Sequence, residues 1–167
     1  MIPVVSDPLL QLSSLLLQHH YRIVTAESCT GGGIAAAITS LPGSSSWFWG
    51  GFITYHNQAK VNLLNVKEED LDQFGAVSRV VAAAMASGAL RNSSADWAVS
   101  VSGIAGPGGG TRDKPVGTVW VGVAGFSGYH SEKRYQFSGS REEVREQAVR
   151  ESIIQLISGI FGEAGNN

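Results

Sequence analysis

The chain has 167 residues, a length that suits one compact domain, and 43% of them are hydrophobic while 16% are charged. A net charge of −2 provides no basic surface for nucleic acid, and no apolar run approaches the ~20 residues of a membrane span. A single cysteine, Cys29, excludes an internal disulfide framework and a cysteine-based zinc site. Because residues 1–8 contain no basic leader, the sequence predicts a cytoplasmic protein without membrane or nucleic-acid partners.

Helical and strand-like patterns alternate along the chain. Leucines at helical spacing predict a helix over residues 9–20, and a β-branched run predicts a strand over residues 22–26. Further strands are expected over residues 47–55, 97–101, 116–125 and 129–138, and further helices from residue 34, over 60–64, 66–75 and 80–90, and after a capping box that begins at Ser140. This order predicts an α/β fold in three layers, with a mixed sheet of about five strands between helices, as a single domain over residues 1–167.

Residues 25–33 (TAESCTGGG) join the first predicted strand to the next helix. Ser28 could act there as a nucleophile, with N–H groups of the helix start holding an oxyanion, although a tight turn with a hydroxyl N-cap explains the same pattern. A second glycine-rich loop, residues 102–111, follows a buried strand. We expect the two loops to meet at strand ends and to form one pocket.

The glycines also invite comparison with nucleotide-binding loops. Gly31 and Gly33 fit a dinucleotide fingerprint, but no acidic residue occurs between Glu27 and Glu68 to bind a ribose. No lysine completes a phosphate-binding loop at residues 102–111, and the four histidines lack the spacing of metal ligands. We therefore expect neither a metal nor a cofactor.

Several side chains could activate Ser28. Lys60 in a desolvated pocket would have a lowered pKa and could take the serine proton, and Tyr55 could relay that proton or donate to a developing anion. A solvated lysine and a half-buried aromatic residue are the alternative interpretations of these two positions. A triad through His56 or His130 has no motif around it, and Cys29 is a rival nucleophile that fits a small buried hydrophobic role better.

Five motifs in order carry a resemblance to a known family: TAESCTGG at 25–32, TYHNQAK at 54–60, GAVS at 75–78, GIAGPGGGT at 103–111 and KPVGT at 114–118. From about residue 9 to residue 160, the chain resembles the carboxy-terminal domain of the competence-damage-inducible CinA proteins. That family includes the nicotinamide-nucleotide amidohydrolases. The pyrophosphatase-like domain of its two-domain members has no counterpart in the sequence.

The resemblance implies hydrolysis of nicotinamide mononucleotide to nicotinate mononucleotide and ammonia, without a metal. It implies that Ser28 is the nucleophile and that Lys60 and Tyr55 are its partners. Arg141 would meet the phosphate. The other substrate-binding positions that it implies are Thr30, Gly31, Gly32, Asn57, Ser102, Gly103, Ala105, Gly106, Gly109, Gly110 and Thr111.

Three positions depart from the family pattern. His56 replaces a usual serine, Ser102 a common threonine, and Ser140 a common aspartate. Three hypotheses follow: an enzyme of the pyridine nucleotide cycle, a weakly active or inactive relative that binds a nucleotide, or a purely structural oligomeric partner. The alanine-rich helix at 80–90 and the aromatic residues at 47–49 also suggest a homodimer or a higher homo-oligomer.

Overall fold

The computed structural model describes residues 7–164, so most of residues 1–8, on which the expected absence of a leader rests, lie outside it. Its helices are α1 (Pro8–His19), α2 (Gly33–Thr39), α3 (Asn57–Leu64), α4 (Glu68–Phe74), α5 (Arg79–Arg91) and α6 (Arg141–Ala164), with a 3₁₀ turn at Ser44–Ser46. Its strands are β1 (Ile23–Glu27), β2 (Phe48–Ile53), β3 (Trp97–Gly103), β4 (Thr118–Gly125) and β5 (His130–Gln136). Within the described residues no helix is both long enough and apolar enough to cross a membrane.

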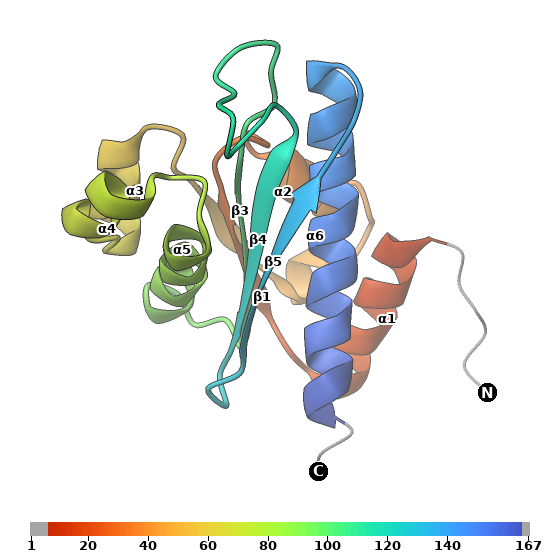
Figure 1. Cartoon of the computed structure of the whole chain (residues 1–167). Helices are drawn as coiled ribbons and strands as arrows, with labels where there is room; N and C mark the ends of the chain where they lie inside the picture. The colour runs from red at the N-terminus through yellow and green to blue at the C-terminus, as the bar shows by residue number, and fades with distance from the viewer. Residues whose placement is uncertain (1–6, 165–167) are drawn as a thin grey trace.

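The strands form one mixed sheet in the order β2-β1-β3-β4-β5. β1 runs parallel to β2 and β3, whereas β4 and β5 are antiparallel additions at the other side. Helices α1, α2 and α6 lie on one face of the sheet, and α3, α4 and α5 lie on the other (Figure 1). The predicted three-layer α/β fold with a mixed sheet is confirmed.

Each face of the sheet has its own hydrophobic core. Leucines of α1 and isoleucines of α2 and α6 fill one core, and the small residues of α5 fill the other. Ser100 on β3 donates to the Ala82 carbonyl of α5 at 2.6 Å, and a side chain at Gly88 would collide with the Leu64 carbonyl. The alanine-rich helix therefore packs closely on the sheet and on α3.

The glycine pair Gly50-Gly51 in β2 accompanies two local features of the sheet. The pairing with β1 advances from Phe48 directly to Gly50, which places a bulge at Trp49. A side chain at Gly51 would collide with the Thr25 hydroxyl. The close approach brings β2 tightly against β1 just before both strands reach the site.

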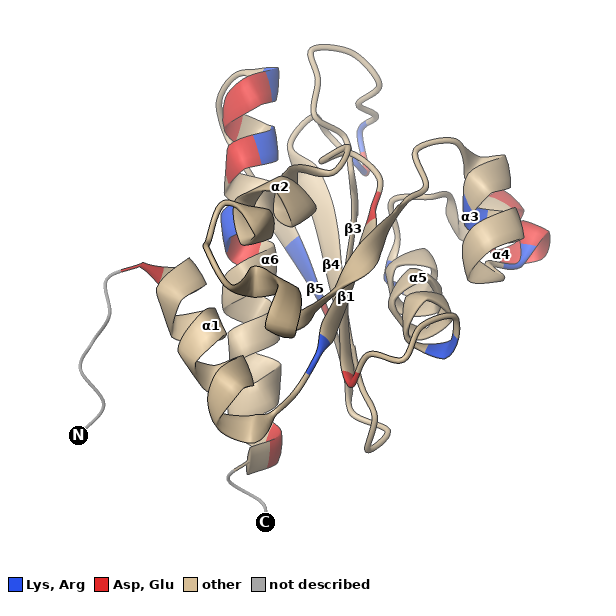
Figure 2. Ribbon diagram, turned by 180° about the vertical axis from the view of Figure 1, so that it is seen from behind, with Lys and Arg blue, Asp and Glu red and all other residues tan. Residues whose placement is uncertain are grey.

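Charged residues are concentrated on α6 and on α3 and α4, and β5 carries others (Figure 2). Glu68 and Glu69 in the first turn of α4 are exposed, where they favour the helix dipole. The acidic first turn of α4 therefore lies in solvent.

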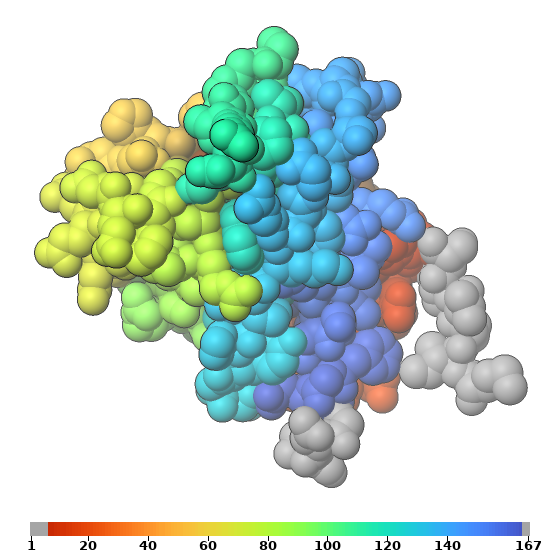
Figure 3. Space-filling view, viewed as in Figure 1, coloured from red at the N-terminus to blue at the C-terminus, as the bar shows by residue number. Residues whose placement is uncertain are grey.

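The carboxyl ends of β1, β2 and β3 meet at one edge of the sheet. Glu27, the last residue of β1, pairs with Ile53 of β2 and with Val101 of β3. The segments that leave these strands therefore start side by side, at the position where open α/β sheets bind ligands. The loop that connects β3 to β4 stands beside the first turn of α6 at this end of the molecule (Figure 3).

Candidate active site

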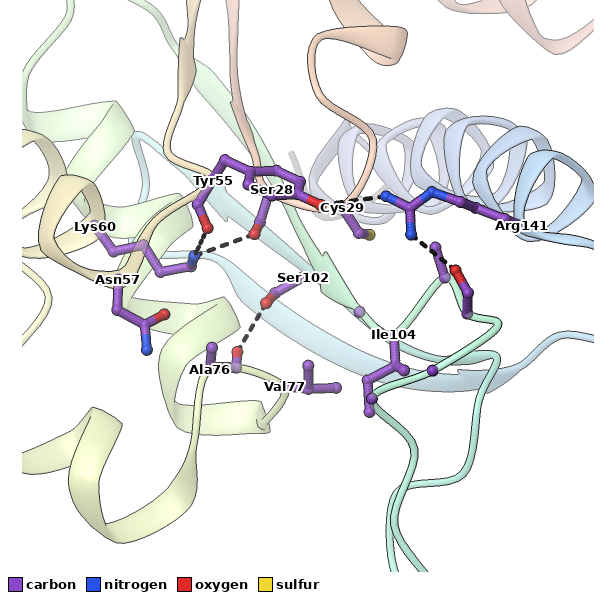
Figure 4. A pocket seen from close by; sticks show the side chains of 15 residues that line it. Ser28, Cys29, Tyr55, Asn57, Lys60, Ala76, Val77, Ser102, Ile104 and Arg141 are labelled. Atoms are coloured by element: carbon purple, nitrogen blue, oxygen red, sulfur yellow. Dashed lines mark hydrogen bonds between the residues drawn. The ribbon is translucent and has the colours of Figure 1, made fainter.

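A pocket of about 300 Å³ opens at this edge of the sheet. Ser28 and Cys29 come from the turn after β1, and Tyr55, Asn57 and Lys60 come from the end of β2 and from α3 (Figure 4). The remaining wall consists of the segment before α5, the glycine-rich loop after β3 and the first residue of α6. The two predicted glycine-rich loops thus contribute to one pocket.

Lys60 and Ser28 are in direct contact. The Lys60 Nζ atom lies 3.1 Å from Ser28 Oγ, and the lysine side chain is only 1% exposed. Nζ also donates to the carbonyl oxygens of Thr54 at 2.8 Å and of Tyr55 at 3.1 Å. In the described part of the chain, no carboxylate lies within salt-bridge distance of this amine. Burial accordingly lowers the pKa of Lys60 below its ordinary 10.5.

The geometry around Nζ determines what a neutral Lys60 can do. A neutral amine has two N–H groups and one lone pair, and the two carbonyl oxygens can only accept hydrogen bonds. The N–H groups therefore point at Thr54 and Tyr55. The lone pair is left facing Ser28 Oγ, which is the arrangement of a general base with its alcohol.

Glu27 occupies the helix start that the sequence suggested for an oxyanion. Its buried carboxylate accepts hydrogen bonds from the N–H groups of Ile34 at 2.8 Å and Ala35 at 3.0 Å, both in the first turn of α2. Thr30 also donates to Glu27, at 2.7 Å. The first N–H groups of α2 are therefore engaged within the protein, and an oxyanion must find other donors.

Three predicted binding residues of the first loop do not line the pocket. Thr30 turns its hydroxyl to Glu27, and Gly31 and Gly32 adopt left-handed backbone angles, with φ of 57° and 97°. Glycine adopts such angles without strain. In this structure these residues shape the turn that carries Ser28.

Tyr55 contacts the lysine through its backbone and Arg141 through its side chain. Its carbonyl accepts from Lys60, but no hydrogen bond joins its hydroxyl to Lys60 or to Ser28. Oη lies 3.2 Å from the Arg141 guanidinium, whose other terminal nitrogen donates to the Gly106 carbonyl at 2.8 Å. Arg141 thus bridges two walls at the pocket rim (Figure 4).

The loop after β3 supplies most of the backbone in the pocket. Ser102, Gly103, Ala105, Gly106 and Gly109 line it as predicted, and the Ser102 hydroxyl donates to the Ala76 carbonyl at 2.8 Å. Among the hydrogen bonds of the described residues, none uses the N–H groups of Ala105, Gly106 or Gly109. These groups are free to bind an anion.

The far end of this loop turns away from the pocket. Gly110 and Thr111 do not line it, and Thr111 instead closes a small turn with Lys114 through hydrogen bonds of 2.8 Å and 3.1 Å.

Sequence reasoning missed part of the apolar wall. Ala76, Val77 and Ile104 line the pocket although no periodicity marked them. Their only signal was membership of the shared motifs. Cys29 also lines the pocket, and burial raises the pKa of its thiol to about 11, which keeps it protonated near neutral pH and favours the non-nucleophilic interpretation.

His56, one of the three departures from the family pattern, lies outside the pocket lining. Its Nδ1 atom accepts from the Gln58 N–H at 3.0 Å, so the imidazole caps α3. A serine can form the same kind of cap. The helix therefore begins at Asn57, and Lys60 lies inside it rather than at its start as predicted. Across residues 7–164, no group of three or more His, Cys, Asp or Glu side chains is arranged to hold a metal ion.

Comparison with known proteins identifies the family. The family model of the CinA C-terminal domain matches residues 7–160. "Nicotinamide-nucleotide amidohydrolase PncC" of Pseudomonas putida is 52% identical over 93% of this chain and 96% of its own length. The protein of the same name from Escherichia coli K12 is 51% identical, covering 87% and 88%.

Comparison with solved structures supports the same family. A CinA superfamily protein from Klebsiella pneumoniae 700603 matches with a TM-score of 0.89 and 35% identity, covering 93% of this chain and 96% of its own. A competence/damage-inducible protein from Agrobacterium tumefaciens matches with a TM-score of 0.86 and 41% identity, covering 91% and 95%. The chain belongs to the CinA C-terminal domain family.

Proposed function

We propose that this chain is an amidohydrolase that converts nicotinamide mononucleotide to nicotinate mononucleotide and ammonia, with Ser28 as the nucleophile and Lys60 as the base. The activity in the names of its relatives supports the reaction. The observation that carries the mechanism is the 3.1 Å contact between Lys60 Nζ and Ser28 Oγ. Lys60 is buried there, and among the described residues no carboxylate lies within salt-bridge distance of its amine.

In the first half of the reaction, Ser28 Oγ attacks the carboxamide carbon while its proton passes to neutral Lys60. The resulting tetrahedral oxyanion needs donors, and the free N–H groups of the loop at Ala105 and Gly106 are candidates that border the same pocket. The Lys60 ammonium then gives its proton to the leaving nitrogen. Ammonia departs and an ester on Ser28 remains.

In the second half, Lys60 is neutral again and can activate water. A water molecule loses a proton to Nζ and attacks the ester carbon, and that proton returns to Ser28 Oγ when the ester bond breaks. The products are nicotinate mononucleotide and the original dyad. One base thus serves both steps.

The charge of the pocket fits a phosphorylated substrate. The Arg141 guanidinium and the Lys60 amine border it, and no carboxylate lines it. The guanidinium of Arg141 lies at the rim, where it could exchange its contact with Tyr55 for a phosphate oxygen. We propose that Asn57 and Ser102, which line the space between Lys60 and the loop, contact the nicotinamide group.

The test is an assay of ammonia release, with chromatography of the nucleotide product. Wild type should turn over nicotinamide mononucleotide, whereas Ser28→Ala and Lys60→Ala should lose about 10²–10⁴-fold. Ser14→Ala, at an exposed position of α1, is the matched control and should match wild type. Full activity in Ser28→Ala would rule out this nucleophile, and tight binding without turnover by wild type would favour the nucleotide-binding hypothesis.

A place in the pyridine nucleotide cycle follows from the proposed reaction, because it would return the pyridine nucleotide to its acid form. The single domain, the homo-oligomer and the cytoplasmic location stay predictions.

A further inference from the structure

The turn that carries Ser28 is bound on the side away from the pocket by a carboxylate. Glu27 precedes the serine and is fully buried. Its Oε1 atom accepts from the Thr30 hydroxyl at 2.7 Å and the Ile34 N–H at 2.8 Å. Its Oε2 atom accepts from the Ala35 N–H at 3.0 Å and the Thr25 hydroxyl at 3.3 Å.

These hydrogen bonds join the segments that precede and follow Ser28. The donors lie both before and after the serine, so one side chain ties the end of β1 to the start of α2. All four partners are donors, which requires acceptors on both Glu27 oxygens. A glutamine would turn an NH₂ group toward the Ile34 or the Ala35 N–H, and the contact that ties that N–H to the turn would be lost.

A second side chain holds the same turn from α6. The Arg145 guanidinium donates through Nε to the Cys29 carbonyl at 3.2 Å and through a terminal nitrogen to the Thr30 carbonyl at 3.1 Å. A planar guanidinium can hold two successive carbonyls, whereas a lysine offers a single point of charge. Neither Glu27 nor Arg145 lines the pocket.

We propose that Glu27 and Arg145 are positioning residues, which fix the backbone of residues 28–30 so that Ser28 Oγ stays within hydrogen-bond distance of Lys60. The inference rests on the proposed function, because it assumes that Ser28 is the nucleophile. A misplacement of about 1 Å can cost about 10²-fold in rate. Loss of either side chain should therefore slow the chemistry while leaving the substrate contacts across the pocket in place.

The experiment compares Glu27→Gln and Arg145→Lys with wild type. A fluorophosphonate, which forms a phosphorus–oxygen bond to an activated serine and releases fluoride, reports both the rate and the stoichiometry of labelling by intact mass. Steady-state assays with nicotinamide mononucleotide give kcat and KM. Arg150→Gln, an exposed arginine on the same helix, and Glu69→Gln, an exposed acid on α4, are the controls.

For both variants we expect full labelling stoichiometry, a labelling rate and a kcat lower by about 10–100-fold, and a KM within about twofold of wild type. A merely structural role would instead lower the stoichiometry at an unchanged rate per labelled site, and that result would overturn the proposal. So would wild-type rates in both variants.

Failure of the proposed function looks different, because wild type itself would then show no labelling at Ser28 and no turnover. If Glu27→Gln does not yield folded protein, Arg145→Lys decides the matter. Its guanidinium is only half-buried, so this variant removes the contacts to the turn without opening the core.

Discussion

The Nζ atom of Lys60 lies 3.1 Å from Oγ of Ser28, although 32 positions separate the two residues in the chain. The same nitrogen donates to the main-chain carbonyls of Thr54 and Tyr55. The serine is therefore the only one of these three hydrogen-bond partners that can also donate. Five predictions follow from this contact and from the groups around it.

The reactivity of Ser28 should rise with pH. Burial lowers the pKa of Lys60 below 10.5, and only the neutral amine can accept the serine proton. The rate of fluorophosphonate labelling should therefore increase with pH up to the lowered pKa and level above it. This measurement avoids the titration of the substrate phosphate near pH 6. Lys67→Met, at an exposed lysine, should keep the profile, and a flat profile in wild type would exclude Lys60 as the base.

Tyr55→Phe should separate binding from proton transfer. The contact of Tyr55 with Lys60 uses the backbone carbonyl, which phenylalanine retains, whereas the contact with Arg141 uses the lost hydroxyl. We expect KM to change by no more than several-fold, since Arg141 would exchange this contact for a phosphate oxygen when the substrate binds, and kcat to change little. A fall in kcat of about 10²-fold or more at constant KM would instead establish a proton relay through the phenol.

Arg141→Gln should weaken binding of the phosphate. Hydrogen bonds to charged groups contribute about 1.5–3 kcal/mol, which corresponds to a KM increase of roughly 10–150-fold. Nicotinamide riboside, which lacks the phosphate, serves as the matched substrate. Its KM should be similar in wild type and variant; an equal loss for both substrates would show that the arginine only supports the loop at Gly106.

The Cys29 thiol should react slowly despite lining the pocket. Burial raises its pKa to about 11, so the thiolate fraction at pH 8 is on the order of 10²-fold below that of an ordinary thiol. Alkylation by iodoacetamide, followed by intact mass, should be slower than alkylation of glutathione by at least that factor. Because Cys29 is the single cysteine, the signal has one source. Rapid modification at pH 8 would restore Cys29 as a rival nucleophile.

His56 should matter for stability more than for chemistry. Its imidazole caps α3, and replacing a helix cap by alanine costs about 1 kcal/mol. His56→Ala should lower the free energy of unfolding in urea by that amount, whereas His56→Ser should retain most of it because serine can cap the same N–H. If both variants unfold like wild type, the cap contributes nothing measurable.

The layers and most elements were predictable because they depend on local patterns. Leucine spacing marks α1, and alternation marks β4. The element limits were less predictable, because partners from elsewhere in the chain set them. β3 continues through Gly103, which pairs with Val119 on β4, two residues beyond the predicted end.

In the site, too, features set by local sequence were predictable, and contacts between distant residues were not. Ser28 was singled out from its glycine-rich turn and Lys60 as a possible base, and the shared motifs supported both, but only the folded chain brings them together. Glu27 could not be recognised from sequence, since its donors come from residues on both sides of the turn. The Tyr55 hydroxyl was expected beside the dyad because its residue adjoins Lys60 in a motif. The backbone there turns the ring outward, leaving the side chain 60% exposed.

The two acceptors that orient Lys60 belong to the peptide backbone at Thr54 and Tyr55, and no change of side chain can delete a carbonyl. Relatives could therefore exchange nearly every neighbour of the amine, and so acquire new substrates, while inheriting the direction of its lone pair. We therefore expect side chains at the pocket rim to differ among relatives, whereas the backbone conformation at Thr54 and Tyr55 should stay the same.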